Sequence, residues 1–501
     1  MKANTVTWIA RILKYTLLAG AALYLLTYLI LACFRLPYPF ELEWMEGGAV
    51  DHVRRILGGQ VLYVQPSLEF IPYIYTPLYF YLSAGLAGIT GVGFVPLRLV
   101  SIAASIGCFA VIFLLVKRET ERPLAGFLAC SLFAATYRIG GAWLDIARVD
   151  SLFLFLLLLA IYWIRFGTTW RSDIAAGLLL TLAFLTKQSA LLIALPLLLY
   201  ALLTNRRRSL ALIATTAVGI GGSTLLLNAL HQGWYVYYIF DLPRQHQLLP
   251  AVLVTFWAVD LFFPLPLASL AAILYLVGRP AKAVGQARLF YLLVAAGMLA
   301  GAWFSRLHFG GYDNVLLPAY VALALLFGLG VHALTGFIRS KDRRTLLEIG
   351  IYVTCLAQFA LLVYSPAAQV PTTRDRAAGE SFIHTVEQIP GEVLIPYHGT
   401  LPALAGKRSY AHWMALSDVL RSERGEARDR LSEELKEAIR EQRFAAIIVD
   451  IPDWLPDLLE THYQRAGPVL AEDAFWPVTG PRIRPEYLYL PRPAIPLEDL
   501  Q

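Results

Sequence analysis

The sequence predicts an integral membrane protein, with an all-α domain of about eleven spanning helices followed by a small C-terminal α/β domain. Hydrophobic residues make up 57% of the 501 residues and charged residues only 16%, whereas soluble domains are roughly a quarter charged. Up to about Tyr364, apolar runs of roughly 17–24 residues follow one another, the length a helix needs to cross a bilayer. Beyond Tyr364 charged residues are frequent and no spanning run remains.

These runs place a multi-spanning domain at residues 1–365 and an extramembrane α/β domain at 366–501. The spans are expected near residues 12–34, 96–116, 123–140, 149–166, 173–186, 188–204, 210–230, 253–277, 288–305, 315–336 and 346–364. The segment 78–89 is apolar but interrupted by glycines, so it is interpreted as re-entrant or interfacial, with a twelfth span as the alternative.

Basic clusters in alternate loops, such as Lys117–Arg118 and Arg206–Arg207, indicate a cytoplasmic N-terminus in an inner (plasma) membrane. An odd number of spans then places the C-terminal domain outside the cytoplasm, and one span more or fewer would move it to the other side. The same clusters account for the net charge of +6. We therefore expect no binding to nucleic acid.

Two further regions have recognisable patterns. In the first outer loop, about 35–95, a helix-like stretch runs through Leu57, and an aromatic segment at 72–81 follows. Because Tyr and Trp prefer the headgroup level, interfacial helices are expected there. In the C-terminal domain, helical patterns at 375–388, 426–442 and 453–463 alternate with β-like runs at 392–396 and 444–450, which is typical of an α/β domain.

The first outer loop begins with three carboxylates, Glu41, Glu43 and Glu46. They would provide a general base or ligands for a divalent cation, or they would simply form a solvated loop rim. Glu46 is the preferred base and Glu43 the second candidate, because a helix is expected to begin directly behind Glu46.

Three later clusters map to the same predicted outer face. Between the third and fourth spans, Asp145 and Asp150 flank Arg148. This pattern predicts either a plain salt bridge or an arginine that binds phosphate. Lys187, followed by Gln188, separates two apolar runs, and it would snorkel to the interface or meet an anionic headgroup. The remaining cluster contains Arg306, His308 and Asn314 around a Gly-Gly pair.

Acids and bases on one membrane face suit a reaction on an anionic lipid. A base would take the proton of an acceptor hydroxyl, while cations would hold a departing phosphate. Two other classes remain open. A transporter or flippase would place ionisable residues near the bilayer midplane, and a non-catalytic membrane anchor would only display the C-terminal domain.

At this point the sequence resembles the GT-C superfamily of membrane glycosyltransferases, and within it the bacterial relatives of protein O-mannosyltransferases and of the lipid A aminoarabinose transferase. The resemblance covers roughly residues 10–365 and is most specific at 41–100. Its parts are the acidic motif after the first span, Tyr75-Thr76-Pro77, Arg148-Val149-Asp150, Lys187-Gln188, and the loop from His308 to Asn314. Many such enzymes have an Asp-Glu pair where this chain has Met45-Glu46, and some have a lysine at the position of Thr76.

The resemblance implies an inverting hexosyl or pentosyl transferase. It would use a polyprenyl-phosphate-linked sugar as donor and act on a glycan, lipid or protein at the outer face. It also implies a GT-C-like fold in which Glu46 or Glu43 acts as base. The substrate-binding residues would then be Tyr75, Asp145, Arg148, Asp150, Lys187, Gln188, Arg306, His308 and Asn314. A divalent cation held by Glu46 and Asp150 is an alternative that the ligand spacing does not require.

Overall fold

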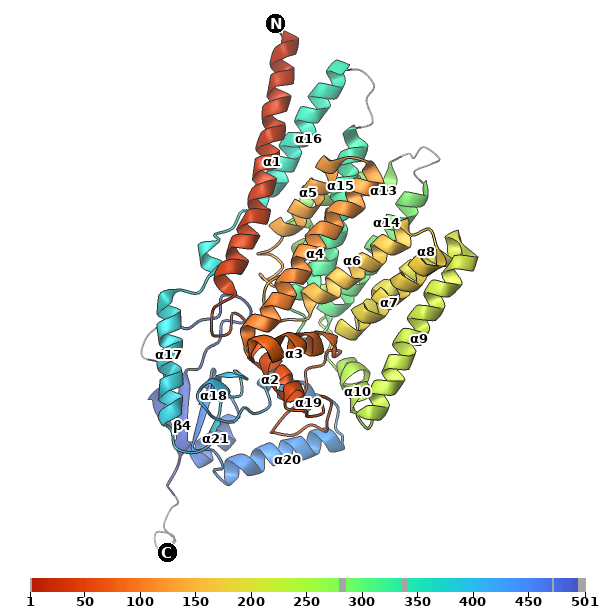
Figure 1. The fold of residues 1–501 in the computed structure, drawn as a ribbon. Coiled ribbons are helices and arrows are strands. Elements are labelled where there is room, and N and C mark those ends of the chain that lie inside the picture. The colour runs from red at the N-terminus through yellow and green to blue at the C-terminus, as the bar shows by residue number, and fades with distance from the viewer. Residues whose placement is uncertain (1, 279–284, 336–340, 471–472, 494–501) are drawn as a thin grey trace, which may run out of the picture.

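The computed structural model describes residues 2–278, 285–335, 341–470 and 473–493, and the chain in these ranges is mostly helical. Figure 1 shows long helices packed side by side, with the N-terminus at one end and the C-terminal region at the other. The N-terminal part contains α1 (Lys2–Arg35), α2 (Glu46–Leu57), α3 (Leu78–Thr90), α4 (Phe94–Thr120), α5 (Pro123–Ala135), α6 (Asp150–Phe166), α7 (Trp170–Thr186), α8 (Ala190–Thr204) and α9 (Arg206–Leu230).

The middle of the chain contains shorter and irregular helices between the remaining long ones. They are α10 (Trp234–Val236), η1 (Tyr237–Asp241), α11 (Leu242–Arg244), α12 (Val252–Thr255), η2 (Phe256–Phe262), α13 (Pro266–Val277), α14 (Gly285–Leu307), η4 (Asp313–Leu316), α15 (Leu317–Thr335) and α16 (Lys341–Leu361). The apolar helix α15 is the centre of the bundle: its neighbours include α4, α5, α13 and α14, and its residues from Leu317 to Val331 are all buried.

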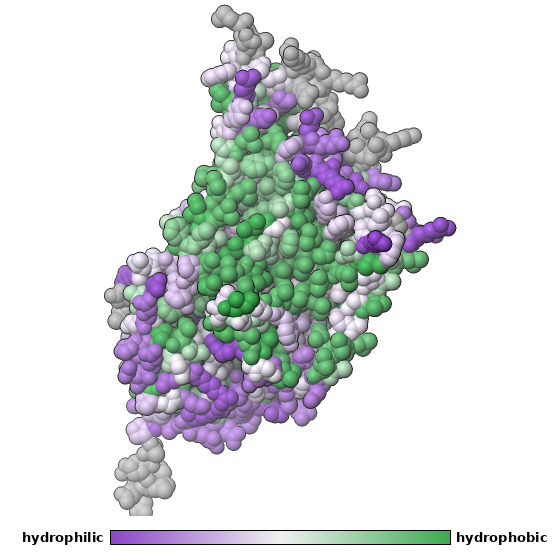
Figure 2. Space-filling model, in the orientation of Figure 1, coloured by the Kyte–Doolittle hydropathy of each residue, from purple (hydrophilic) through white to green (hydrophobic). Residues whose placement is uncertain are grey.

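The surface confirms a multi-pass membrane protein. Among the residues that the structure describes, five helices are long and apolar enough to cross a membrane, or six if one bent pair of helices is counted as a single span. Large apolar side chains such as Leu23, Leu225 and Phe263 are exposed. On the face shown in Figure 2, hydrophobic residues cover the middle of the molecule and hydrophilic residues gather towards both ends, as expected when lipid is the solvent. The predicted number of eleven spans and the domain boundary at 365 stay predictions.

Two of the expected spans differ from the structure. The run at 253–277 is not straight, because Val252–Phe262 and Pro266–Val277 meet at 98°. Pro264 and Pro266 lack the N–H groups that a continuous helix would use. The Gln358 side chain stabilises the break, since it accepts from the backbone of Leu267 and donates to the carbonyl of Pro264, each at 3.0 Å.

The second difference is at 123–140, where the helix already ends at Ala135. The chain then runs through a largely buried loop to α6, and this loop contains several of the predicted site residues. A buried loop must satisfy its backbone polar groups internally. Here Arg35 of α1 does part of this, because its Nη2 donates to the carbonyl of Ala142 at 3.1 Å.

The C-terminal region has the predicted α/β character. It contains η5 (Ala367–Gln369), α17 (Thr373–Gln388), β1 (Val393–Leu394), α18 (Leu401–Leu404), α19 (Trp413–Leu420), α20 (Glu426–Arg440), β2 (Ala446–Val449), α21 (Pro456–His462), β3 (Tyr463–Pro468) and β4 (Tyr487–Pro491). The strands form a sheet of order β1-β2-β4-β3, with β1 and β2 parallel and the other pairs antiparallel. The predicted domain at 366–501 includes residues 471–472 and 494–501, which lie outside the described residues.

The predicted helices and the strands β1 and β2 of this region are found, whereas β3 and β4 were not predicted. The first outer loop is also as expected in outline: α2 ends at Leu57 before Gly58, and the apolar segment after Pro77 forms the short helix α3. The α2 helix and the C-terminal region lie at the same end of the molecule (Figure 1). This arrangement brings the first loop and the C-terminal domain together around the predicted site.

Candidate active site

The three carboxylates of the first loop are all buried, and each one has a different cationic partner. Glu46 pairs with Arg98 of α4, Glu43 pairs with Arg148 of the loop before α6, and Glu41 pairs with His398 of the C-terminal domain. The side chains are 0%, 1% and 9% exposed, in that order. A solvated loop rim, the plain alternative from the sequence, is therefore excluded.

Glu46 is held by hydrogen bonds on both oxygens. Oε1 accepts from Arg98 Nε at 3.0 Å and from the backbone N of Ala147 at 2.6 Å. Oε2 accepts from Arg98 Nη2 and from the backbone N of Leu42, both at 2.6 Å. Burial alone would raise the pKa of Glu46, but the charge of Arg98 and these hydrogen bonds hold it below its usual value. Glu46 thus stabilises the loop as a buried anion.

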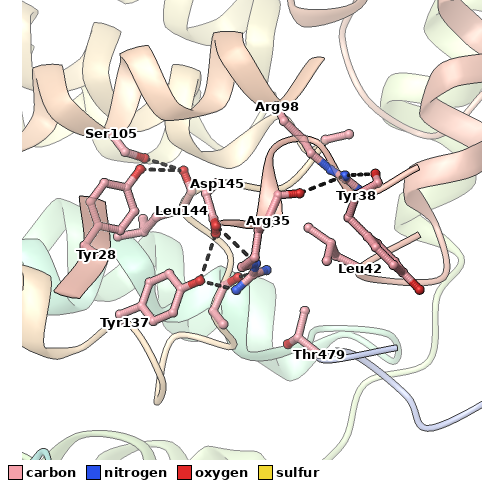
Figure 3. A network of polar contacts seen from close by, with 12 residues as sticks. Tyr28, Arg35, Tyr38, Leu42, Arg98, Ser105, Tyr137, Leu144, Asp145 and Thr479 are labelled. Atoms are coloured by element: carbon pink, nitrogen blue, oxygen red, sulfur yellow. Dashed lines mark hydrogen bonds and ion pairs between the residues drawn. The ribbon is translucent and has the colours of Figure 1, made fainter. Parts of the chain in front are cut away.

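Arg98 fixes the rest of the loop through backbone carbonyls. It donates to the carbonyl of Arg35 at 3.2 Å and to those of Tyr38 and Phe40 at 2.6 Å each. Figure 3 shows this arginine close to the turn that follows α1. A fully buried arginine at the start of an apolar helix is costly unless it is paired, and here its hydrogen-bond partners lie between the end of α1 and the start of α2, the segment that carries the carboxylates.

Asp145 belongs to a neighbouring buried network, shown in Figure 3. Its carboxylate lies 3.1 Å from Arg35 Nε and accepts from the Tyr137 hydroxyl at 3.0 Å. From the sequence, Arg148 would either form a plain salt bridge with a flanking aspartate or bind phosphate. Asp145 does not form that salt bridge, because it pairs with Arg35 at the end of α1, and the carboxylate that contacts Arg148 is that of Glu43. The alternative of phosphate binding stays a prediction.

Glu43 has a looser environment than Glu46. Its Oε2 is 3.4 Å from Arg148 Nη1, and Arg148 Nη2 donates to the Tyr75 hydroxyl at 3.0 Å. Burial raises the pKa of Glu43 to about 8, although the charge of Arg148 acts in the opposite direction. A carboxyl group with such a pKa is suited to accept a proton near neutral pH.

The next cation along this side is Lys187, at the junction of α7 and α8. Its Nζ is 2.6 Å from Asp150 Oδ1, the oxygen that also accepts from Asn314 Nδ2 at 3.1 Å. The other oxygen, Oδ2, is buried and has no hydrogen-bond partner in the part of the chain that the structure describes. These three side chains line a small pocket, together with Ser189, Ser305 and apolar residues. The charge of Asp150 also acts on Arg148. The pair of Lys187 with Asp150 and the pair of Arg148 with Glu43 are therefore neighbours.

The remaining predicted residues lie around this centre. Gln188 donates to the carbonyl of Ile74 at 2.7 Å and so supports the segment that carries Tyr75. Arg306 pairs with Asp260 at 3.1 Å and with Asp313 at 3.3 Å, next to Asn314. The lining of this pocket does not include Glu43, Glu46, Arg148 or His308. His308 bonds instead to the carbonyl of Phe304 at 2.8 Å within its own helix turn.

The C-terminal domain covers the loop from the other side. The backbone N of Thr479 donates to the carbonyl of Leu42 at 3.2 Å, and the Thr479 hydroxyl donates to the carbonyl of Gly141. Next to it, Gly480 has a φ of +80° and lies so close to Glu43 that a Cβ there would be 2.8 Å from Glu43 Cγ. Glu43 is therefore enclosed between the membrane domain and the C-terminal segment.

This chain is similar in sequence to a known protein family and in fold to solved structures. The family model of dolichyl-phosphate-mannose-protein mannosyltransferases matches residues 74–234. The structure of ArnT from Cupriavidus metallidurans bound to undecaprenyl phosphate superposes with a TM-score of 0.57 at 12% identity, over 94% of this chain and 97% of that one. Compared with curated proteins, the sequence has no match.

A second structure, the archaeal oligosaccharyltransferase AglB from Archaeoglobus fulgidus in complex with an inhibitory peptide and a dolichol-phosphate, superposes with a TM-score of 0.56 at 14% identity, over 90% of this chain and 73% of that one. ArnT and AglB are GT-C superfamily glycosyltransferases. The chain has a GT-C fold. The resemblance that the sequence indicated is confirmed, and the site described above lies at the end of this GT-C fold where the first loop meets the C-terminal domain.

Sequence reasoning missed several residues of this candidate site. Arg98 interrupts the apolar sequence at the start of the second expected span, a signal that an ionisable residue in a membrane segment always gives. His398 and Asp450 gave no comparable signal: His398 contacts Glu41 through Nδ1 and donates to Asp450 Oδ2 through Nε2 at 2.9 Å. Although burial opposes it, the carboxylates of Asp450 and Glu41 raise the pKa of His398 to about 10.

The alternative of a divalent cation between Glu46 and Asp150 does not fit these contacts. The two carboxylates pair with different cations, Arg98 and Lys187. Among residues 2–278, 285–335, 341–470 and 473–493, no group of three or more His, Cys, Asp or Glu side chains is arranged to hold a metal ion. We therefore derive the chemistry below from the side chains alone.

Proposed function

We propose that the protein transfers a sugar from a polyprenyl-phosphate-linked donor to an acceptor at the outer face of the membrane. The GT-C fold, the match to a mannosyltransferase family model, and the undecaprenyl phosphate and dolichol-phosphate in the similar structures support a lipid-phosphate donor. The observation that carries the proposal is the enclosed Glu43 beside Arg148, because this pair offers a proton acceptor and a cation for a phosphate. Lys187 adds a second cation where it lines the neighbouring pocket with Asp150.

Glu43 is our candidate for the general base. Its pKa is raised to about 8 and its contact with Arg148 is long, so the ionised form is a better proton acceptor than that of Glu46. All four hydrogen bonds of Glu46 would compete with an incoming proton. The prediction that Glu46 acts as base stays untested, and the geometry favours a positioning role for it.

Arg148 and Lys187 are the candidates for binding the donor phosphate. Arg148 presents a planar group suited to phosphate oxygens, and Lys187 supplies a point charge beside the pocket. The unpartnered Oδ2 of Asp150 would accept a hydrogen bond from a sugar hydroxyl. Asn314 holds the other oxygen of Asp150 in place.

The reaction then balances without a further reactant. Glu43 accepts the proton of the acceptor hydroxyl, and the hydroxyl oxygen forms a new bond to the anomeric carbon. The bond between that carbon and the phosphate oxygen breaks, and its electron pair leaves on the polyprenyl phosphate, which Arg148 and Lys187 stabilise. Attack opposite to the leaving phosphate would invert the anomeric centre.

The test is transfer by the purified full-length protein in liposomes, with a panel of undecaprenyl-phosphate-linked hexoses and pentoses and a cell-envelope extract as acceptor. We expect a new glycosylated product by mass spectrometry, lost in Glu43→Gln and in Lys187→Ala. The exposed Glu380 and Lys117 provide matched controls, Glu380→Gln and Lys117→Ala, that keep the rate. Wild-type rates in both site variants, or flux of the lipid across sealed vesicles without any covalent product, would refute the proposal.

A further inference from the structure

Hydrogen bonds from the C-terminal region reach the backbone on both sides of Glu43. The backbone N of Thr479 donates to the carbonyl of Leu42 at 3.2 Å, and Nε2 of His412 donates to the carbonyl of Trp44 at 3.1 Å. Leu42 and Trp44 are the direct neighbours of Glu43 in the chain. The proposed base is therefore held by two separate parts of the C-terminal region.

His412 is a neutral donor with a fixed orientation. A carbonyl oxygen only accepts, so Nε2 carries the hydrogen, while Nδ1 accepts from the backbone N of Met414 at 3.1 Å, at the start of α19. The ring also packs against the ring of Trp44, with 4.9 Å between their centres. Burial lowers the pKa of His412 to about 3. The hydrogen bond to Trp44 thus keeps the same form over the pH range of an assay.

Thr479 belongs to the connection that precedes β4, and we call residues 473–484 the cover segment. The backbone N of Phe475 donates to Asp375 Oδ1 at 2.8 Å, which anchors this segment on α17. The Thr479 hydroxyl donates to the carbonyl of Gly141, in the buried loop that leads to α6. The cover segment is therefore fixed both to the C-terminal region and to the membrane domain.

The cover segment closes over the Glu43 side chain at Gly480. A Cβ at this glycine would lie 2.8 Å from Glu43 Cγ and 3.3 Å from its Oε1. Glu43 is only 1% exposed. Burial is the main cause of its raised pKa, which the carboxylates of Glu46 and Glu41 raise further and the charge of Arg148 lowers. Moving the cover segment away would admit water to Glu43 and remove part of this burial.

We propose that Thr479 and His412 are positioning residues for the transfer reaction: they fix the backbone on both sides of Glu43, and the cover segment excludes water from its carboxylate. This inference rests on the proposed function, in which Glu43 is the general base. Both residues act through Glu43, and neither has to contact a substrate. A merely structural role would lower the melting temperature without changing the pH at which Glu43 takes up a proton.

The test is a pH titration of Glu43 in the purified full-length protein by infrared difference spectroscopy. This method detects the C=O stretch of the protonated carboxyl group, which is assigned by its loss in Glu43→Gln. We expect a wild-type midpoint near pH 8. Thr479→Val keeps the shape of the side chain without its hydroxyl, and His412→Phe keeps a ring without its donor. Both should lower the midpoint by about one pH unit or more, because water then reaches the carboxyl group.

A conservative variant and a control accompany these two. Thr479→Ser retains the hydroxyl and should restore the wild-type midpoint. The exposed Thr385 donates to the carbonyl of Ser381 within α17, and Thr385→Val is the matched control that keeps the midpoint. In transfer assays Thr479→Val and His412→Phe should lower kcat by about 10- to 100-fold. The KM for the donor should be unchanged, since Arg148 and Lys187 are retained.

Unchanged midpoints in Thr479→Val and His412→Phe, with or without a lower melting temperature, would overturn the inference. A wild-type midpoint at the ordinary value of a glutamate would overturn it as well, and a midpoint that Thr479→Ser fails to restore would refute the role of the Thr479 hydroxyl. The titration requires neither donor nor acceptor, so it judges the cover segment separately. Absence of any transfer by the wild type would instead refute the proposed function.

Discussion

Glu46, at the start of α2, and Glu43, in the loop before it, are both buried beside an arginine. They differ in the number of hydrogen bonds that they accept and in the direction in which their pKa is shifted. Glu46 accepts four hydrogen bonds of 2.6–3.0 Å, and its pKa is lowered. Glu43 has one contact of 3.4 Å to its arginine, and its pKa is raised to about 8. The comparison shows that donor saturation, and not burial or charge pairing alone, separates a structural carboxylate from a candidate base.

The largest expected effect is on catalysis. Replacing Glu43 by glutamine keeps the shape of the side chain and removes only its ability to take a proton. We expect transfer to fall by about 100- to 10,000-fold, the usual contribution of a general base, with an unchanged melting temperature. Transfer assays measure the loss of rate, and thermal unfolding of the same preparation checks that the melting temperature is unchanged. A comparable loss in Glu46→Gln with intact stability would return the role of base to Glu46.

The next effect is on stability and concerns the other member of the comparison. Arg98→Met leaves the buried Glu46 without its cation, and breaking such a pair costs about 3–5 kcal/mol. We expect a markedly lower melting temperature in detergent solution. The surface pair of Arg376 with Glu380, about 60% exposed, supplies the control Arg376→Met, which should change stability by less than about 1 kcal/mol. Equal stability of the two variants would show that Arg98 does not hold the loop.

A smaller effect is expected at Gly47, which packs against the Glu41 carboxylate and the backbone of Thr400 in the C-terminal region. A Cβ at this position would lie 2.0 Å from Glu41 Oε1 and 2.9 Å from the backbone N of Thr400. Gly47→Ala should therefore destabilise the protein by about 1–3 kcal/mol, the cost of overpacking. Gly85→Ala, in α3, has nothing within 4 Å of the new atom and should be neutral. Thermal unfolding of both variants is the measurement. Equal melting temperatures would show that a methyl group at Gly47 fits beside Glu41 and Thr400.

The smallest effect concerns the pH dependence of transfer. Only the ionised form of Glu43 accepts a proton, so the rate should rise with pH until about pH 8 and then level off. In Arg148→Gln burial acts on Glu43 without an opposing charge, which raises its pKa further. The rising limb of the pH profile should then move to higher pH, independently of any loss of phosphate binding. An identical limb in both proteins would indicate that another group titrates.

The sequence by itself determined the membrane class and most helix positions, because the length and polarity of apolar runs are local properties. It also identified the loops that carry charge, since a charge beside apolar sequence is visible without a structure. Lys187 shows this well: its position between two runs predicted a helix junction, and α7 ends at Thr186. The predicted orientation in the membrane has not been tested.

Only the tertiary structure decided which charges pair. Glu46 meets Arg98 across 52 positions of sequence, and Glu41 meets His398 across 357. The helix dipole made Glu46 the favoured base from the sequence, but its hydrogen bonds come from Arg98 and from the backbones of Leu42 and Ala147, which no local pattern can specify. Pairing depends on how distant segments pack, because a buried charge takes whichever partner the fold places beside it.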